Sequence, residues 1–357
     1  MAYTTIDDPS EFFQCTLYTG NSSNNTVTNV GNSDLKPDIV WGKCRSTTKT
    51  HYFYDSIRGV ENRVETDNTG NQDSNTNGVV EFQTDGFRLA SGNTENDNGE
   101  TFVAWQWKIN GGTVANNTAG NTTTSVQTNL AAGVTIGTYE GNSSNGNSIG
   151  HGLGAIPDFF MIKGYTGSGT KYWTIGCPNI ASMANGASKI LFLDTDNAVM
   201  NDTSIWGNVS LTDSIVTINS GQQVNHVNSD YMFYAFKNIQ GYSKVGQYIG
   251  SGGIGITAPF TYTGFKPAFL MMKRTDSSGN WVMFDNKRDT SNVTKHRLFP
   301  NLTNADNTTR DYIDLLSNGF KMRNTDVDHN ASGSTIMYIA FAENPFVTST
   351  GVPATAR

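Results

Sequence analysis

The chain has 357 residues and a formal net charge of −7, and only 15% of its residues are charged, against about 25% in ordinary globular chains. It holds no lysine- or arginine-rich run, which excludes the clustered basic charge that nucleic-acid binding requires. No apolar run reaches the ~18 residues of a transmembrane helix, so membrane insertion is not expected. Short apolar runs alternate instead with Gly, Asn, Ser and Thr, and this composition predicts an all-β fold.

Residues 1–13 are predicted to form an N-terminal arm. The run Pro9–Glu11 can open one helical turn that is too short to be stable alone. Phe12 and Phe13 follow it, and the arm offers little sequence in which to bury the two rings. We therefore expect Phe12 and Phe13 to be anchors at a contact, either with the chain's own first repeat or with another protein of an assembly.

Three cysteines, Cys15, Cys44 and Cys177, are too few and too scattered for a disulfide framework. Two of them flank apolar strand patterns, which predicts small buried side chains. The polar, acidic start of the chain is not typical of a secretory signal. Together these features predict synthesis and folding in a reducing cytosol.

One strand pattern occurs three times, and the chain is organised around it. Each copy has a proline, a short residue, four mostly apolar residues and a lysine six positions after the proline. The apolar run predicts a strand buried on both faces, with the lysine at its return to solvent. The copies read PDIVWGK from Pro37, PDFFMIK from Pro157 and PAFLMMK from Pro267.

Each copy also has the same neighbours. A tyrosine-containing turn lies 18 or 19 residues upstream, at Tyr18, Tyr139 and Tyr248. A second apolar strand pattern with an alanine lies downstream. A fixed internal period of this kind predicts a repeat architecture, and the three alanines should then occupy equivalent places. They are Ala104, Ala235 and Ala340.

We therefore predict three tandem β-sandwich repeats of the jelly-roll or lectin-like kind, at residues 14–108, 134–240 and 241–346. Residues 109–133 are rich in Gly, Asn and Thr and are predicted to be a linker, although their second half alternates weakly as an added strand would. Residues 347–357 are predicted to be a polar C-terminal tail.

The groups of charged residues in the sequence are interpreted as structural and not as parts of a catalytic site. The pairs Asp55–Arg58 and Asp285–Arg288 follow equivalent strands and are interpreted as local ion pairs or turn caps. The acidic clusters at Asp194 and Asp326 have alternating carboxylates, as calcium loops do, but lack the glycine and distal glutamate of an EF-hand. We predict no cofactor, with calcium as the alternative.

No nucleophile elbow, phosphate-binding loop or metal-ligand spacing is present, so the chain is predicted not to be an enzyme. Aromatic side chains can stack on sugar rings, but Trp173 and Trp281 hold equivalent places on repeated strands and are expected in the core. Trp206 lies in a polar stretch without a repeat counterpart. It is the one candidate ligand-binding residue, expected to be exposed.

Several stretches resemble a family of tail-fibre-like structural proteins encoded by marine bacteriophages, including those of cyanobacteria. They are MAYTTIDDPSEFFQCTLYTGN, GHGLGAIPDFFMIK, GYSKVGQYIGSG, YTGFKPAFLMMKRTDSSGNW and YIAFAENPF. The resemblance implies a virion component with a sandwich of the lectin or laminin-G kind, and it supplies no catalytic residue. Because the chain has no long coiled-coil or collagen-like shaft, it is expected to be a compact knob.

The resulting functional hypothesis is a non-enzymatic virion protein, made in the host cytoplasm and placed on the exterior of the tail or head. Its expected role is attachment to host-surface glycans. Its expected partners are other virion proteins, further copies of itself and a host cell-surface polysaccharide. One alternative is a capsid decoration or head-surface protein, and a third hypothesis is a polysaccharide-degrading tailspike.

Overall fold

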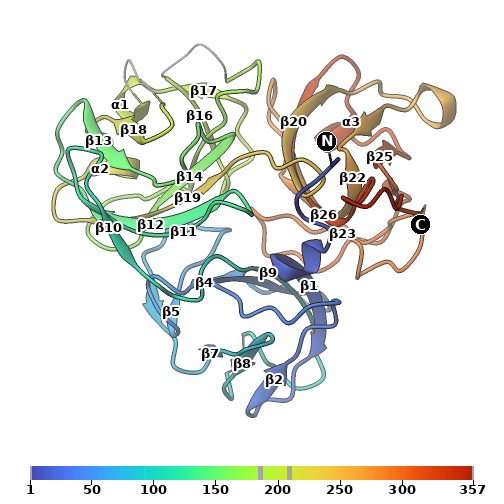
Figure 1. Cartoon of the computed structure of the whole chain (residues 1–357), viewed down its shortest axis with the longest axis horizontal. Helices are drawn as coiled ribbons and strands as arrows, with labels where there is room; N and C mark the ends of the chain where they lie inside the picture. The colour runs from blue at the N-terminus through green and yellow to red at the C-terminus, as the bar shows by residue number, and fades with distance from the viewer. Residues whose placement is uncertain (1, 93, 184–187, 207–210, 356–357) are drawn as a thin grey trace.

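The computed structural model describes residues 2–92, 94–183, 188–206 and 211–355. The fold is all-β, as predicted, and is built from antiparallel sheets. Three lobes surround a common centre (Figure 1). We call them the first segment (13–108), the second segment (109–240) and the third segment (241–346). Among the described residues, no helix is long and apolar enough to span a membrane.

The first segment pairs a large sheet, in the order β1-β9-β3-β4, with a small sheet, in the order β2-β8-β7. A two-stranded ribbon, β5-β6, lies beside them. The strands are β1 (Phe13–Thr19), β2 (Asn25–Val27), β3 (Ile39–Cys44), β4 (Tyr52–Asp55), β5 (Asn62–Arg63), β6 (Asp73–Ser74), β7 (Val79–Phe82), β8 (Phe87–Leu89) and β9 (Thr101–Trp107).

The second segment repeats this order as β12-β19-β14-β15, inside an eight-stranded sheet that β10, β11, β16 and β17 extend, and pairs β13 with β18. The stretch 109–133, expected as a linker, thus contributes two strands. The elements are β10 (Ala115–Asn117), β11 (Thr124–Asn129), β12 (Val134–Glu140), β13 (Asn147–Gly150), β14 (Phe159–Gly164), β15 (Thr174–Gly176), β16 (Lys189–Phe192), β17 (Met200–Asn201), α1 (Thr203–Trp206), β18 (Ile215–Ile218), α2 (Gln222–Asn225) and β19 (Asp230–Phe236).

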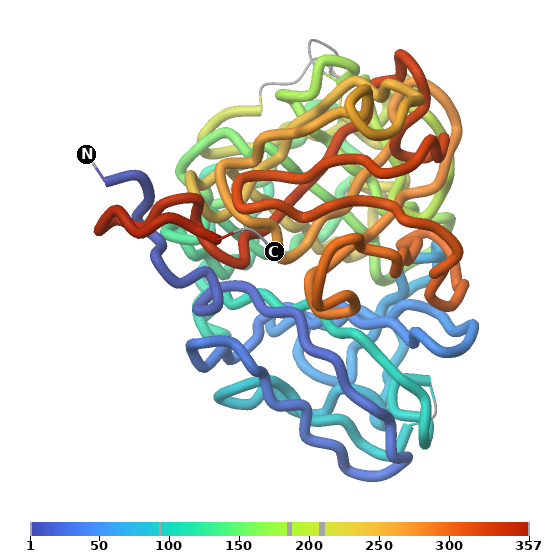
Figure 2. Tube along the Cα trace, turned by 90° about the vertical axis from the view of Figure 1, so that its right-hand side faces the viewer, coloured from blue at the N-terminus to red at the C-terminus, as the bar shows by residue number. Residues whose placement is uncertain are grey.

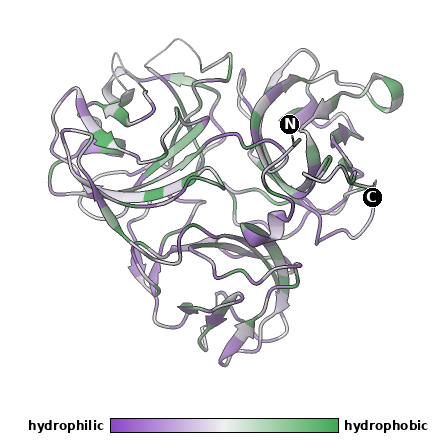
Figure 3. Ribbon diagram, in the orientation of Figure 1, coloured by the Kyte–Doolittle hydropathy of each residue, from purple (hydrophilic) through white to green (hydrophobic). Residues whose placement is uncertain are grey.

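The third segment again has the order β20-β26-β22-β23, with a small sheet β21-β25-β24. Its elements are β20 (Ser243–Ile249), η2 (Gly255–Thr257), β21 (Phe260–Tyr262), β22 (Phe265–Arg274), β23 (Val282–Asp285), β24 (Ile313–Leu316), β25 (Gly319–Met322), α3 (Val327–Asn330) and β26 (Thr335–Pro345). The loop around η2 projects with an apolar tip, where Ile256 is 98% exposed (Figure 3).

Strand alternation divides the apolar residues between two kinds of core. In β14, Phe160 and Ile162 face the small sheet of their own segment. Phe159 and Met161 point the opposite way, because successive side chains of a strand alternate between faces, and they join a core shared by all three segments. The repeated strand patterns are therefore buried on both faces, as predicted.

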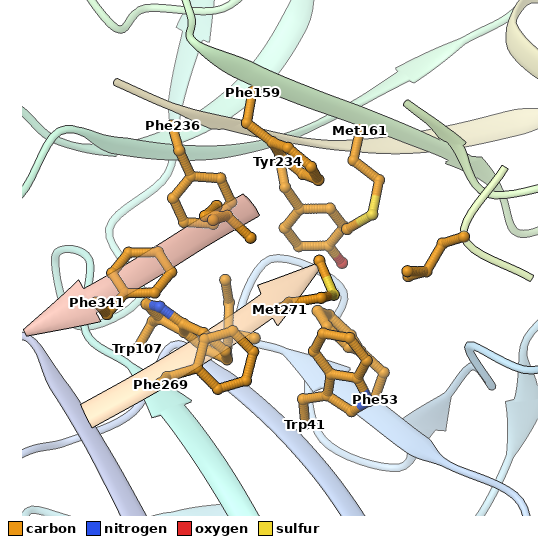
Figure 4. A pocket seen from close by; sticks show the side chains of 13 residues that line it. Trp41, Phe53, Trp107, Phe159, Met161, Tyr234, Phe236, Phe269, Met271 and Phe341 are labelled. Carbon is orange, nitrogen blue, oxygen red and sulfur yellow. The ribbon is translucent and has the colours of Figure 1, made fainter. Parts of the chain in front are cut away.

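The shared core lies where the three large sheets meet. Side chains from each sheet point toward one another there, around a cavity of about 30 Å³ (Figure 4). A cavity of that size holds about one water at most, and its apolar lining gives a water no partners. It is a packing void. Aromatic and Met residues that line it include Trp41, Trp107, Phe159, Met161, Phe236, Phe269, Met271 and Phe341.

The lysines that end the repeated pattern are buried, which corrects the expectation that they return to solvent. Lys43, Lys163 and Lys273 are all 0% exposed. Each stands two residues beyond a side chain of the shared core, on the same face of its strand, and each ammonium donates to backbone carbonyls such as Cys44 O (2.8 Å) and Gly279 O (2.6 Å). Burial lowers the pKa of each lysine to about 8.

The three alanines are only partly equivalent. Ala235 and Ala340 stand opposite Phe160 and Leu270, the third residue after each proline. In the first segment that place belongs to Gln106, and Ala104 lies two residues earlier on β9. The strands match as predicted, but the alanine in the first segment was assigned to the wrong register.

A closed ring of hydrogen bonds joins the segments. Trp173 Nε1 donates to Glu65 O (2.8 Å) and Trp281 Nε1 donates to Phe192 O (2.8 Å). His51 completes the ring from the first segment to the third. Its Nδ1 accepts from Trp41 Nε1 (3.1 Å), which leaves Nε2 to donate to Phe299 O (2.9 Å). The indole nitrogens of Trp173 and Trp281 thus each bond to the preceding segment, and the imidazole of His51 joins the first segment to the third.

The arm runs from the shared core to the third segment. Phe13 belongs to β1 and stacks on Phe341, so it anchors the chain to itself. Phe12 packs edge-on against Tyr242 after the short η1 helix (Pro9–Glu11). Both contacts reach the third segment, which was not expected, and Phe13 also packs on Trp107 of its own segment. The arm and the C-terminal tail lie side by side (Figure 2), and Ser349 N donates to Asp7 (2.6 Å).

Candidate functional site

Trp206 is not an exposed ligand-binding residue. It ends α1 with 7% exposure and packs edge-on against Phe160, with ring centroids 6.3 Å apart. Its indole also closes over Gly176. Sequence reasoning failed because the neighbouring residues are polar, whereas the indole turns inward to fill the core of the second segment.

The two Asp–Arg pairs are structural, as interpreted. Arg58 Nε bonds Asp55 at 2.8 Å and Arg288 Nε bonds Asp285 at 2.6 Å, and all four side chains are buried. Each aspartate also accepts a hydrogen bond from a neighbouring segment. Tyr234 donates its hydroxyl to Asp55 (2.6 Å), and Trp105 Nε1 donates to Asp285 (3.1 Å). The pairs therefore join segments.

The acidic clusters are engaged in other ways. Asp194 accepts from Trp173 N (3.3 Å), and Asp326 caps α3 and pairs with Arg297 (2.8 Å). Across the described ranges, no group of three His, Cys, Asp or Glu residues is arranged to hold a metal ion. Cys15 and Cys44 are buried and free, as predicted, and Cys177 is buried and free as well.

The most distinctive polar site is a depression of about 420 Å³ in the first segment, beside β5 and the loops after β6 and β8. Its size falls within the roughly 300–1,000 Å³ of small-ligand pockets. We call it the Glu95 depression. Its described lining residues, none of them aromatic, are Arg63, Asn75, Asn77, Ser91, Gly92, Thr94 and Glu95.

Glu95 is 1% exposed yet lines this depression. Its Oε1 accepts from Tyr54 (2.9 Å), from Asn75 Nδ2 (2.8 Å) and from Arg63 (3.3 Å). Its Oε2 accepts from the Tyr54 hydroxyl at 3.0 Å. Burial raises the pKa of Glu95 to about 7, against the opposing effect of Arg63. Near neutral pH this carboxyl can therefore both donate and accept hydrogen bonds.

Arg63 ends β5 and points its guanidinium at several carboxylates. It lies 2.6 Å from Asp73, 3.3 Å from Glu95 and 3.4 Å from Glu65. The β5–β6 ribbon sets this geometry, since Arg63 stands directly opposite Asp73 in the antiparallel register. One cation thus faces three acidic groups.

Equivalent backbone positions in the other segments carry different side chains. Tyr18 donates to Glu95 O (2.7 Å), and Tyr139 donates to Val224 O (2.5 Å) in the same way. Tyr248 donates to the carbonyl of His329. The residue that follows each carbonyl is an asparagine, Asn96, Asn225 and Asn330, whose Oδ1 accepts from the turn after the first strand. Glu95, Val224 and His329 therefore occupy one place in the repeated scaffold.

The position of Arg63 varies in parallel. Val64, Leu191 and Leu298 pair with equivalent strands, so the residues before them correspond. They are Arg63, Ile190 and Arg297. In the third segment the guanidinium of Arg297 lies between the rings of Phe299 and Tyr312, 4.6 and 4.5 Å from their centroids. Burial lowers the pKa of the adjacent His329 to about 4.

These comparisons locate chemistry that the sequence alone did not indicate. Glu95 lies 32 residues after Arg63, within a run of ordinary polar loop residues. The usable signal was the repeat itself, because alignment on Tyr18, Tyr139 and Tyr248 exposes the Glu, Val and His that follow each small sheet. The arrangement can bind a polar ligand by hydrogen bonds from amide, guanidinium, hydroxyl and carboxyl groups.

A family model described as a domain of unknown function, DUF7483, matches residues 8–345. No curated protein and no solved structure matches the chain.

Proposed function

The chain belongs to the DUF7483 family, and we propose that it is a non-enzymatic structural protein on the exterior of a bacteriophage particle, where it attaches the particle to host-surface glycans. The observation that carries the proposal is the Glu95 depression. The scaffold accepts Val224 at the same place in the second segment. At this place in the scaffold, folding therefore does not require a buried acid, a guanidinium or surrounding amides.

The architecture supports the same role. The recurring strand order favours three tandem β-sandwich repeats of one kind. A shared core and a closed ring of hydrogen bonds hold the three repeats together. Such a body presents its surface loops rigidly, which lowers the entropy cost of binding. Several copies on one particle would add avidity without new contacts, through effective concentration. The resemblance to tail-fibre-like phage proteins supplies the setting.

Two measurements test the proposal. Cryo-electron microscopy of the phage particle should place the protein on the tail or head exterior, and the purified protein should bind features of a glycan array. Absence from particles would contradict the virion role. An external position with no glycan bound at any density would favour the alternative, a decoration or head-surface protein.

The tailspike hypothesis makes a different demand. Glycoside cleavage generally uses a pair of carboxyl groups, and Glu95 and Asp73 share Arg63 as a neighbour. Release of reducing sugar from a bound polysaccharide, abolished by Glu95→Gln, would replace attachment with hydrolysis. Stable binding without sugar release is the outcome expected for a non-enzymatic protein.

A further inference from the structure

The charge of the Glu95 depression limits what it can bind. Arg63 is balanced by Asp73, whose carboxylate lies 2.6 Å away, and it also faces Glu65 and Glu95. A second carboxylate, sulfate or phosphate brought by a ligand would meet this excess of acidic groups in a partly desolvated place. Like charges repel there more strongly than in water. An acidic ligand is therefore disfavoured.

The hydrogen-bonding groups point to a ligand rich in hydroxyl or amine donors. Among the described residues, only the Tyr54 hydroxyl is seen donating to Glu95 Oε2, at 3.0 Å. A carboxylate oxygen has two acceptor sites, so Oε2 can accept one bond more. Asn75, Asn77, Ser91 and Thr94 add amide and hydroxyl groups around it. With no aromatic side chain in the described lining, recognition depends on hydrogen bonds instead of ring stacking.

Resting on the attachment function proposed above, we infer that the Glu95 depression binds a neutral or amine-bearing saccharide unit, and that Glu95 sets its preference against acidic saccharides because Asp73 and Glu65 already balance the charge of Arg63. Glu95 accepts from a hydroxyl or ammonium group of the ligand. Asn75 positions Glu95, because its Nδ2 donates to Oε1 (2.8 Å) and to the Tyr54 hydroxyl (3.2 Å).

The second segment shows how to remove the site while keeping the fold. It carries Val224 and Ile190 where the first segment carries Glu95 and Arg63. The double variant Arg63→Ile/Glu95→Val therefore installs side chains that this scaffold already accommodates. Glu95→Gln is a milder change, since the amide keeps the shape and an acceptor for Tyr54. Glu81→Gln is the matched control, because it neutralises an exposed acid of the same segment that pairs with Arg88 (2.9 Å).

The experiment uses the full chain on an array of neutral, amine-bearing and acidic saccharides, followed by titration calorimetry with the best-bound soluble oligosaccharide. The wild-type protein and Glu81→Gln should bind neutral or amine-bearing features. The double variant should bind at least about tenfold more weakly, since it loses a charge-assisted hydrogen bond to the ligand. Its melting temperature should stay close to that of the wild type.

The outcomes separate the two proposals. Glycan binding that survives the double variant, or that prefers acidic saccharides, overturns this inference and leaves the attachment function standing. Failure of the wild-type protein to bind any saccharide overturns both. If the double variant unfolds, Glu95→Gln decides the matter, because an unchanged dissociation constant in that variant would rule out Glu95 as the discriminating residue.

Discussion

The first and second segments place different chemistry on the same backbone. Glu95 and Val224 each lend a carbonyl to a tyrosine hydroxyl, and each precedes an asparagine that holds the opposite turn. One side chain is an acid held by a guanidinium, and the other fills apolar space. Because both segments keep the same strand order, the difference separates what the scaffold needs from what has been added to it.

The largest expected effect comes from moving the acid into the segment that lacks its partners. Val224→Glu puts a carboxyl in a fully buried place where Ile190, and not an arginine, faces it. We expect a loss of about 3–5 kcal/mol, the range found when a buried charge is left without its partner. Chemical denaturation followed by tryptophan fluorescence measures it. A loss below 1 kcal/mol would show that the second segment admits water at this position.

Trp206→Ala tests the apolar side of the comparison. The indole packs against Phe160 in the core of the second segment. We expect a loss of about 3 kcal/mol, at the low end of the range for emptying a buried tryptophan site, since it lies near the surface. Thermal melting measures the loss, with Phe160→Ala as the matched change deeper in the same core. An unchanged melting temperature would indicate that the Trp206 side chain is exposed and does not contribute to the core.

Arg63→Ile removes the cation from the first segment and leaves Glu95 behind. The expected loss is about 2 kcal/mol, because a buried acid loses one hydrogen-bonded partner but keeps Tyr54 and Asn75. The pKa of Glu95 should rise further, since Arg63 now holds it down. Carboxyl titration by NMR measures that rise. A pKa that falls instead would show that Arg63 does not act on Glu95.

Much of this fold was readable from the sequence, for physical reasons. Strands such as Phe159–Gly164 need apolar residues on both faces, and that demand leaves a repeated pattern. Lys163 misled because an ammonium is usually solvated, yet here it bonds to carbonyls of residues 68 and 171. The Glu95 depression could not be predicted because its lining comes from strand β5 and two separate loops. The periodicity of apolar residues indicates which faces of a strand are buried, but it does not indicate which loops lie together in the fold.

The pH dependence of stability distinguishes the two segments more finely. Burial raises the pKa of Glu95 from 4.5 to about 7, so its stabilising contribution is complete below about pH 4.5 and is lost as the pH rises through 7. Glu95→Gln is neutral throughout. Its stability relative to the wild type should therefore rise between pH 5 and pH 8, by on the order of 2 kcal/mol. Other titrating groups, including His329, are the same in both proteins and cancel in this difference. A flat difference would contradict the raised pKa.

The smallest effect on stability is expected from the double variant Arg63→Ile/Glu95→Val. It gives the first segment the two side chains that the second segment carries at the same places. Replacing a buried ion pair by apolar groups of similar volume is commonly neutral or stabilising, so the free energy of unfolding should change by less than about 1 kcal/mol. Asp73 and Glu65 lose the guanidinium, but they are 53% and 22% exposed and can be hydrated instead. Chemical denaturation at pH 7 should therefore show that the effects of the two substitutions are not additive. Arg63→Ile alone should lower the free energy of unfolding more than the double change does. A double variant less stable than either single variant would mean that the pair is part of the scaffold, and the contrast between Glu95 and Val224 would then reflect two ways of packing one position.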